Sequence, residues 1–173
     1  FSGDLISMAP DELESMAPIL RRISAKDGVV SVLGNHDYSP YTDVDEGTRK
    51  RYVEDLVQTE KGMGWNLLID SHEKICRGED SIAVIGVQNI SPSRHFHSHG
   101  DLSKASEGTE GMFSILLSHD PMHWEAEVLS KDIPLTLSGH THAMQISLLG
   151  WSPSSLIFKQ NKGLYSRNGK YLY

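Results

Sequence analysis

The chain has 173 residues, 38% of them hydrophobic and 23% charged, which is ordinary for a globular protein with a core of its own. Its formal net charge of −7 argues against general binding along nucleic acid, because proteins that follow the phosphate backbone are usually basic. The single cysteine, Cys76, excludes a disulfide framework and a cysteine-based zinc site, and no apolar run approaches the ~20 residues of a membrane span.

The first half of the chain alternates helical and strand patterns. Two segments are predicted as helices: residues 7–24, which Pro18 is expected to kink or split, and residues 45–61. Four apolar segments are predicted as strands: 29–33, 65–69, 72–76 and 81–87. The last of these is the clearest strand, and we expect it to be buried on both faces.

The second half resumes the alternation after an irregular stretch, residues 88–100. Helices are predicted over 102–107 and from 121 to about 129, and strands over 112–117, 135–137 and 143–149. The end of the chain is expected to form a hairpin of 164–166 with 171–173 across Asn168-Gly169, a pair that favours a tight turn. Strands that alternate with helices, together with directly adjacent strands, predict α/β layers with mixed sheets.

Polar residues follow three of the predicted strands, and open α/β sheets place their sites at such strand ends. The strands that end near residues 33, 117 and 137 are followed by Asn35, by His119, and by His140 and His142. An extended segment would point the last two rings to one side. Asp4 adds a carboxylate that could bridge two ions, and imidazole and carboxylate without thiolate suit zinc, manganese or iron. The alternative is an asparagine turn, a capping aspartate and separate hydrogen-bonded histidines.

Four motifs in this order resemble those of the calcineurin-like metallophosphoesterases: Gly3-Asp4, Gly34-Asn35-His36-Asp37, His119 and Gly139-His140-Thr141-His142. The resemblance covers nearly the whole chain and looks closest to bacterial phosphohydrolases with a Gly-His-Thr-His-x-x-Gln ending, which continues here to Gln145. It implies a mixed-sheet α/β/β/α sandwich, with residues 1–173 forming one domain that lacks its first strand and is incomplete at both ends.

The resemblance also implies a role for each matching residue. Two divalent metal ions (Mn, Fe or Zn) would be held in the intact protein by five residues: Asp4, which would bridge them, Asn35, His119 and His140 on the second ion, and His142 on the first. His36 would hydrogen-bond the phosphoryl group and protonate the leaving oxygen, with Asp37 holding its ring. The implied reaction is hydrolysis of a small phosphorylated substrate, a mono- or diester, by metal-bound hydroxide that attacks phosphorus.

One departure from the family pattern concerns the first ion. The family opens with an Asp-x-His pair that binds this ion, and no such pair precedes Asp4 here. We therefore expect this fragment to hold one ion or none and to hydrolyse esters poorly. The missing strand would leave exposed sheet edges through which another copy of the chain could associate. The alternatives are a non-catalytic scaffold that kept the fold and a binding module with one structural ion.

The histidines at 95, 97 and 99 alternate like a strand face beside Arg94. They could line the entrance of the site, and the alternative is a solvated histidine-rich loop. The sequence leaves the substrate, the metal and the compartment open. The domain is expected to be soluble, and a segment before Phe1 could carry a membrane anchor or an export signal.

Overall fold

The computed structural model describes residues 1–142 and 159–173, and their strands form two sheets. The smaller sheet pairs β1 (Val30–Ser31) with β2 (Asn66–Leu67) in parallel. The larger sheet has the strand order β3-β4-β5-β6-β8-β7. Its strands are β3 (Ser71–Arg77), β4 (Asp80–Gly86), β5 (Phe113–Leu117), β6 (Leu135–Leu137), β7 (Tyr165–Arg167) and β8 (Lys170–Leu172). The β3-β4 and β7-β8 pairs are antiparallel and the ladders between them are parallel, so the sheet is mixed, as predicted.

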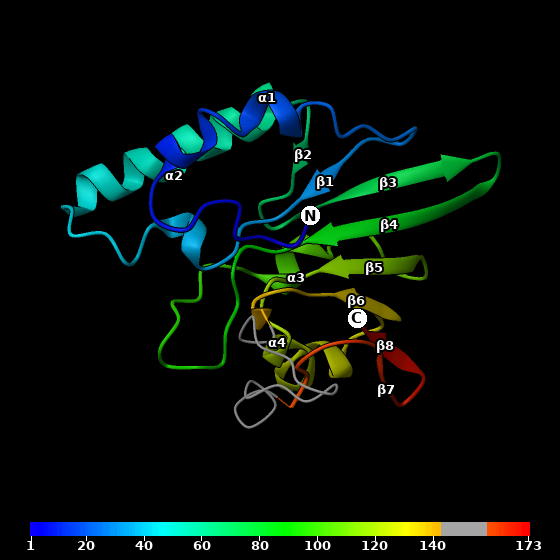
Figure 1. The fold of residues 1–173 in the computed structure, drawn as a ribbon. Coiled ribbons are helices and arrows are strands. Elements are labelled where there is room, and N and C mark those ends of the chain that lie inside the picture. Colours follow the sequence, from blue (N-terminus) through cyan, green and yellow to red (C-terminus); the bar gives the residue numbers. More distant parts are fainter. Residues whose placement is uncertain (143–158) are drawn as a thin grey trace, which may run out of the picture.

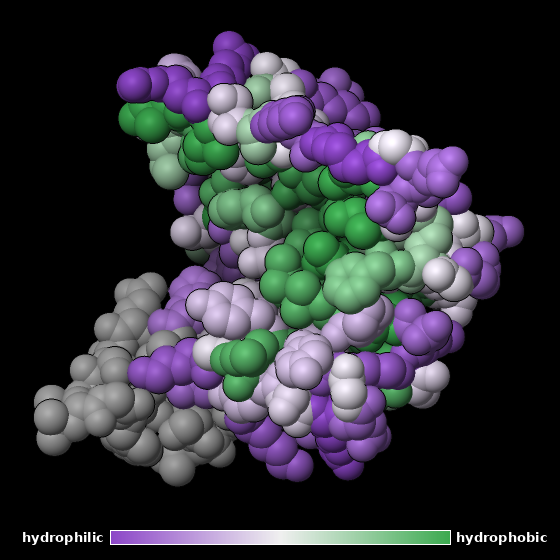
Figure 2. Space-filling model, turned by 90° about the vertical axis from the view of Figure 1, so that its right-hand side faces the viewer, coloured by the Kyte–Doolittle hydropathy of each residue, from purple (hydrophilic) through white to green (hydrophobic). Residues whose placement is uncertain are grey.

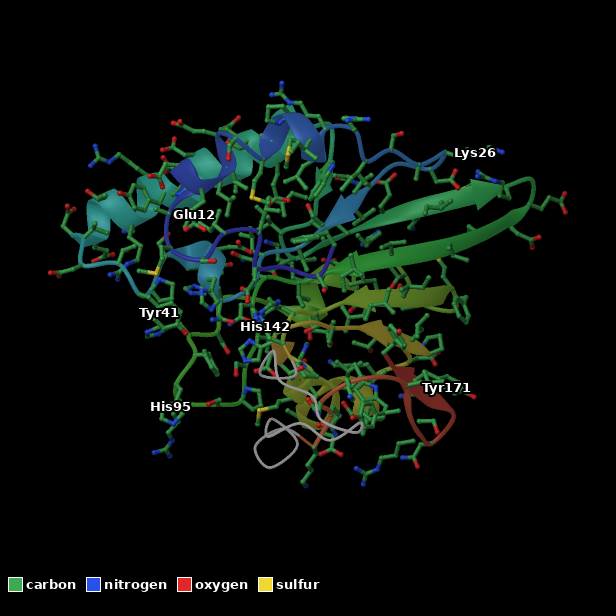
Figure 3. The ribbon with its side chains drawn as sticks, in the orientation of Figure 1. Glu12, Lys26, Tyr41, His95, His142 and Tyr171 are labelled. Carbon is green, nitrogen blue, oxygen red and sulfur yellow. The ribbon has the colours of Figure 1, made fainter. Side chains whose placement is uncertain are left out.

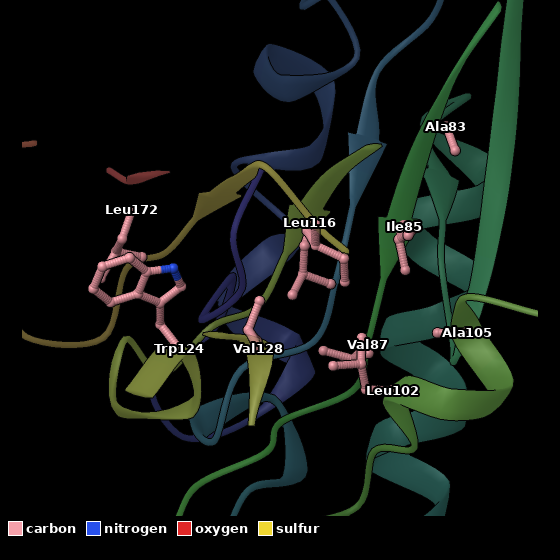
Figure 4. Packing of buried hydrophobic residues seen from close by; sticks show 10 residues of the cluster. Ala83, Ile85, Val87, Leu102, Ala105, Leu116, Trp124, Val128 and Leu172 are labelled. Carbon is pink, nitrogen blue, oxygen red and sulfur yellow. The ribbon is translucent and has the colours of Figure 1, made fainter. Parts of the chain in front are cut away.

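Helices cover the outer faces of both sheets, which gives four layers (Figure 1). Along the smaller sheet lie η1 (Pro10–Leu13), α1 (Ala17–Leu20) and α2 (Glu46–Gly62), packed through a core of Ile6, Leu13, Leu33, Leu56 and Leu67. Against the larger sheet lie α3 (Leu102–Ala105), α4 (Met122–Ala126) and η3 (Val128–Ser130). Their core includes Ile85, Leu102, Leu116, Trp124 and Leu172 (Figure 4). This is the α/β/β/α sandwich that the sequence predicts.

Local sequence explains most of the element boundaries. The carboxylate of Asp45 accepts the N–H of Thr48 at 3.0 Å and so starts α2 at the predicted place. Pro18 splits the predicted helix 7–24 and lies in the first turn of α1, where its missing N–H costs no hydrogen bond. Asn168 and Gly169, with φ of 53° and 74°, form the predicted turn between β7 and β8.

One strand is less buried than predicted. Only the second half of β4 is buried, and its first two residues, Asp80 and Ser81, are exposed. The reason is that the β3-β4 hairpin extends beyond the rest of the sheet, which Figure 1 shows on its right-hand side. The predicted strand over 143–149 lies outside the described residues.

The two sheets meet through a small apolar cluster of Val32, Leu68, Val84 and Leu117. Gly86, the last residue of β4, allows this contact, because a Cβ at that position would lie 2.8 Å from Cγ1 of Val32. The close contact of the sheets brings the loop after β1 near the loops that follow β5 and β6.

One outer face carries apolar side chains between hydrophilic margins (Figure 2). The large apolar side chains that are exposed on the described residues include Phe1, Phe113, Tyr171 and Tyr173. Self-association through sheet edges stays a prediction. Within residues 1–142 and 159–173, every helix is too short or too polar to cross a membrane.

Candidate metal centre

Four ligand-type atoms meet where the N-terminal segment before η1 and the loops after β1, β5 and β6 come together. His119 Nε2 lies 3.0 Å from Asp4 Oδ2, 3.2 Å from Asn35 Oδ1 and 3.2 Å from His140 Nδ1. His140 Nδ1 lies 2.8 Å from Asn35 Oδ1. We call Asp4, Asn35, His119 and His140 the ligand cluster. The structure thus brings together four of the five residues predicted as metal ligands.

The ligand cluster contains more acceptors than protons. The carbonyl oxygen of Ser2 can only accept, so the 2.7 Å contact means that His119 Nδ1 carries a proton. A neutral His119 ring then directs the lone pair of Nε2 at the oxygens of Asp4 and Asn35. Asn35 Nδ2 donates to the Tyr41 hydroxyl at 3.4 Å, which turns Oδ1 towards the cluster. Asn35 Oδ1 can also only accept, so its 2.8 Å contact with His140 Nδ1 is a hydrogen bond only if that nitrogen carries a proton. Lone pairs that converge in this way repel one another unless such a proton or a cation lies between them.

The spacing of the ligand cluster fits a divalent cation. Metal–ligand bonds of about 2.1 Å put neighbouring ligand atoms about 3.0–3.4 Å apart in octahedral or tetrahedral geometry. The separations that involve His119 Nε2 are 3.0–3.2 Å, and that of His140 Nδ1 from Asn35 Oδ1 is slightly shorter at 2.8 Å. Ligating histidines also tend to donate their other ring N–H to a backbone carbonyl, as His119 does to Ser2. Asp4, Asn35, His119 and His140 could therefore hold such an ion.

Charges in the cluster also favour a cation. Burial favours the neutral acid at Asp4, but the His119 ring and the His36 N–H outweigh burial and hold the pKa of Asp4 below its ordinary value. Burial opposes a charge on His119 as well, yet Asp4 outweighs it and raises the pKa of His119. Burial lowers the pKa of His140, although the nearby Asp120 opposes this shift. A second proton on His119, at Nε2, would occupy the position of a metal ion, so protons and metal compete for the centre.

Asp37 holds the backbone beneath the ligand cluster. Its buried carboxylate accepts the backbone N–H of Gly34 at 2.7 Å and those of Asp4 and Leu5 at 2.8 Å each. Asp4 has a φ of 58°, which few non-glycine residues adopt, and these hydrogen bonds keep it there. The prediction that Asp37 holds the ring of His36 is wrong, because both carboxylate oxygens are occupied by backbone N–H groups.

Two glycines let the loops of the centre approach each other. A Cβ at Gly3 would lie 2.5 Å from the backbone nitrogen of Gly34 and 2.8 Å from His119 Nδ1. A Cβ at Gly34 would lie 2.6 Å from the backbone nitrogen of Asp4 and 2.7 Å from His119 Cε1. The glycines of the first two sequence motifs are thus required by packing around His119.

His140 and His142 both adopt left-handed backbone, with φ of 68° and 49°. The prediction of an extended segment between them is therefore wrong. The His140 ring joins the ligand cluster, whereas His142 Nε2 lies 3.8 Å from Asp4 Oδ2 with 49% of its side chain exposed. His142 and Asp4 both line a cavity of about 480 Å³ on this side of the cluster. The fifth predicted ligand is thus next to Asp4 but outside the cluster.

His36 lies beside the ligand cluster without belonging to it. Its backbone N–H donates to Asp4 Oδ1 at 2.9 Å, while its ring nitrogen Nδ1 lies 2.8 Å from the carbonyl oxygen of Ser7. The Ser7 carbonyl can only accept, so Nδ1 carries a proton. The centroid of the His36 ring lies 4.8 Å from that of Tyr41. Ser7 and Tyr41 therefore orient this ring in place of Asp37.

Sequence reasoning missed three residues next to the centre: Tyr41, Phe96 and Asp120. The Phe96 ring meets the ring of His140 at a centroid distance of 4.6 Å and nearly at right angles. Asp120 is fully buried, and its Oδ2 has no hydrogen-bond partner among the described residues. Its position directly after His119 could have indicated Asp120, whereas no pattern in the sequence singles out Tyr41 or Phe96.

Comparisons with known proteins agree with the sequence motifs. A family model described as calcineurin-like phosphoesterase matches residues 1–144. A Danio rerio protein named "Transmembrane protein with metallophosphoesterase domain" is 36% identical over 153 residues, which are 83% of this chain and 32% of that protein. An uncharacterized metallophosphoesterase of Bacillus subtilis, YkuE, is 30% identical over 159 residues, which are 88% of this chain and 49% of that protein.

A solved Staphylococcus aureus structure described as a 5′-nucleotidase aligns with 75% of this chain and 31% of that chain, at 14% identity and a TM-score of 0.49. The chain spans about a third of the Danio rerio relative and about half of the Bacillus subtilis relative.

Proposed function

The chain belongs to the calcineurin-like phosphoesterase family, and on that premise we propose that it hydrolyses phosphoric mono- or diesters at the ligand cluster. The observation that carries this proposal is the convergence of acceptor atoms from Asp4, Asn35, His119 and His140. Bound Mn, Fe or Zn ions would supply positive charge to the phosphoryl oxygens and lower the pKa of a water molecule. The scaffold alternative gains no support from the family match.

His36 is the proposed general acid. Its Nδ1 proton is committed to the Ser7 carbonyl, so Nε2 is the nitrogen that would give a proton to the leaving oxygen. The hydrogen bond from its backbone N–H to Asp4 keeps His36 beside the centre. A ring that binds a metal through its free nitrogen cannot deliver a proton from it, so the separation of His36 from the ligand cluster supports this role. Asp37 acts as a positioning residue, through the backbone of Asp4.

For residues 1–173 taken alone, the proposal is one metal ion at the ligand cluster and slow hydrolysis. A further ion would have Asp4 and the half-exposed His142 as protein ligands, fewer than metal sites usually have.

Two relatives are named transmembrane proteins with a metallophosphoesterase domain, which supports membrane association of the whole protein through another segment.

Metal analysis combined with hydrolysis of p-nitrophenyl phosphate and bis(p-nitrophenyl) phosphate tests the proposed function. His36→Ala should lower kcat by about 10²- to 10⁴-fold while the metal content stays unchanged, because it removes an acid and no ligand. His119→Ala should lower both kcat and the metal content, because it removes a ligand. The matched control is His72→Ala, whose ring contacts the carbonyl oxygen of Ala105 instead of the centre. Unchanged turnover in His36→Ala would remove this residue from the mechanism, and no turnover of either ester by the metal-loaded protein would reject the function.

A further inference from the structure

We propose that a second cavity, which opens on the ligand cluster, binds the organic part of the substrate and selects phosphoric esters whose alcohol carries an aromatic ring and a second negative charge. This inference rests on the proposed function, because it names the substrate class of the same centre. The cavity has a volume of about 500 Å³ and lies between α2, residues 38–41 and residues 95–99. We call it the α2 groove.

The α2 groove borders the ligand cluster at Asn35, which lines it, whereas Asp4, His119 and His140 line the cavity of about 480 Å³ on the other side. Tyr41, on one wall, accepts a hydrogen bond from Asn35 Nδ2 and packs beside the ring of His36. Phe96, on the opposite wall, packs edge-on against His140. Figure 3 shows Tyr41 and His95 on the same side of the molecule, left of His142. A phosphoryl group at the cluster, protonated by His36 on its leaving oxygen, would thus have its alcohol at the mouth of the groove.

Aromatic and aliphatic side chains make up much of the groove wall: Tyr38, Pro40, Tyr41, Val53 and Phe96. Tyr41 is 50% exposed, so its ring is accessible to a ligand in the groove. Tyr38 is held firmly, because its ring stacks on His99 at a centroid distance of 3.9 Å and its hydroxyl donates to Gln88 at 2.9 Å. Such walls bind flat apolar groups by burial and by ring contacts, and a small alkyl ester would leave them unused.

Arg49 gives the groove a positive charge that has no ion-pair partner among the described residues, although Glu46, which also lines the groove, attracts it from beyond ion-pair distance. Among the described residues, the Arg49 side chain forms one hydrogen bond, from Nη2 to the carbonyl oxygen of Thr42 at a long 3.4 Å, and its Nε is buried with no partner there. No carboxylate of residues 1–142 and 159–173 forms an ion pair with it. Lys50, also in the groove, is paired with Glu46 at 3.0 Å. In a chain with a net charge of −7, an unpaired guanidinium in an aromatic groove indicates an anionic ligand group.

The loop that forms the opposite wall is braced in place. The buried carboxylate of Asp70 accepts the backbone N–H of Gln88 at 3.1 Å and that of Asp101 at 3.0 Å, so it joins the two ends of the loop. It also accepts the Gln88 side-chain amide at 2.7 Å. Residues 95–99 therefore form a wall that exists before a ligand binds, which lowers the entropy cost of binding.

Binding of three non-hydrolysable probes to the manganese-loaded protein, measured by titration calorimetry, tests the inference. The expected order of affinity is 4-carboxyphenylphosphonate, then phenylphosphonate, then methylphosphonate. Arg49→Gln should weaken binding of the carboxylated probe by about 10-fold and leave phenylphosphonate within about twofold, because a charge-assisted hydrogen bond is lost. Phe96→Ala should weaken binding of both aromatic probes by a larger factor than binding of methylphosphonate.

The matched control is Arg51→Gln, which removes the same charge from the same helix at an exposed residue that does not line the groove. A second variant, Arg49→Lys, keeps the charge and should retain most of the binding, which separates a folding defect from a lost contact. Equal effects of Arg49→Gln and Arg51→Gln, or equal affinity for phenyl- and methylphosphonate, would overturn the inference. The predicted binding order without turnover of phenyl phosphate would support the groove and reject the proposed hydrolysis.

Discussion

Asp37 shows how one buried carboxylate can set the geometry of a centre to which it contributes no ligand atom. Its oxygens accept backbone N–H groups from two separate loops, the one that carries Asp4 and the one that begins at Gly34. Burial raises the pKa of Asp37 to about 6, the Gly34 N–H opposes this shift, and the neighbouring Asp4 carboxylate adds to it. Near neutral pH the ionised form is thus present and can accept all of these hydrogen bonds.

Asp37→Asn should weaken both folding and metal binding. The substitution replaces one carboxylate oxygen, an acceptor, by an NH₂ group, a donor that faces backbone N–H groups. We therefore expect a loss of about 2–4 kcal/mol in the free energy of unfolding. Because Asp4 loses its support, the affinity for Mn²⁺ should also fall by at least about 10-fold. Urea unfolding and titration calorimetry measure these changes, with the exposed Asp43→Asn as the control. Equal values for the two variants would contradict the positioning role.

The types of the centre's residues could be predicted from the sequence, but their contacts could not. Asn35, His119 and His140 follow strands, and strand ends of stacked sheets meet, so their convergence follows from the order of elements. Which groups Asp37 meets depends on the positive φ of Asp4 and on the close approach at Gly34, and neither leaves a periodic pattern. Tyr41 and Phe96 come from irregular loops, whose paths are set by tertiary contacts.

At the scale of elements, α2 and β1 share a buried ionisable contact. Glu60, near the end of α2, is 1% exposed and accepts a hydrogen bond from the Ser31 hydroxyl of β1. Burial raises the pKa of Glu60 to about 7, although the Ser31 hydrogen bond opposes the shift. The folded chain therefore binds a proton here between about pH 4.5 and pH 7 that the unfolded chain releases.

The free energy of unfolding should consequently fall as the pH rises through this window, with a contribution from Glu60 on the order of 3 kcal/mol. Glu60→Gln keeps an acceptor for Ser31 and removes the titration, so this part of the pH dependence should disappear. Urea unfolding at pH 5 and pH 7.5 measures the difference. Glu54→Gln, exposed on the same helix, should behave like the parent protein. A pH dependence that is the same in all three proteins would show that Glu60 does not titrate in this window.

Elements were predictable where their signals are local. Helix α2 lies within one residue of the predicted 45–61 at both ends, because the Asp45 cap and the apolar spacing are local features. The strand predicted over 29–33 is shorter in the structure, where β1 comprises Val30–Ser31. The reason is that β1 pairs with one strand, β2, in a sheet of two strands. The hidden contact of Glu60 with Ser31 could not be predicted, because it depends on how α2 lies across the smaller sheet.

On the scale of the whole molecule, the ligand cluster joins the two sheets. Asn35 follows β1 of the smaller sheet, whereas His119 and His140 follow β5 and β6 of the larger one. The apolar contact between the sheets is small, comprising Val32, Leu68, Val84 and Leu117. A cation at the cluster would thus connect the two halves of the sandwich as well as serve the reaction.

Metal binding should for this reason stabilise the fold. Mn²⁺ at about 100 times its dissociation constant should add about 3 kcal/mol, which corresponds to a rise in Tm of about 6–12 °C for a chain of this size. Calorimetric scans with Mn²⁺ and with EDTA measure the shift, and His119→Ala should show little of it. An identical Tm under both conditions would mean that the ligand cluster holds no ion.

The sandwich itself could be predicted from alternating elements and from the family resemblance, because both depend on chain order. The α2 groove could not, since its walls come from a helix and two loops that only the complete fold brings together.

The most direct measurement is an anomalous difference map from crystals of the protein grown with Mn²⁺. A metal ion at the ligand cluster predicts one strong peak within bonding distance of Asp4 Oδ2, Asn35 Oδ1, His119 Nε2 and the His140 ring, with the Ser2 carbonyl still bound to His119 Nδ1. A map with no peak there, or with manganese at other residues while these four side chains stay hydrogen-bonded to one another, would contradict the proposed centre.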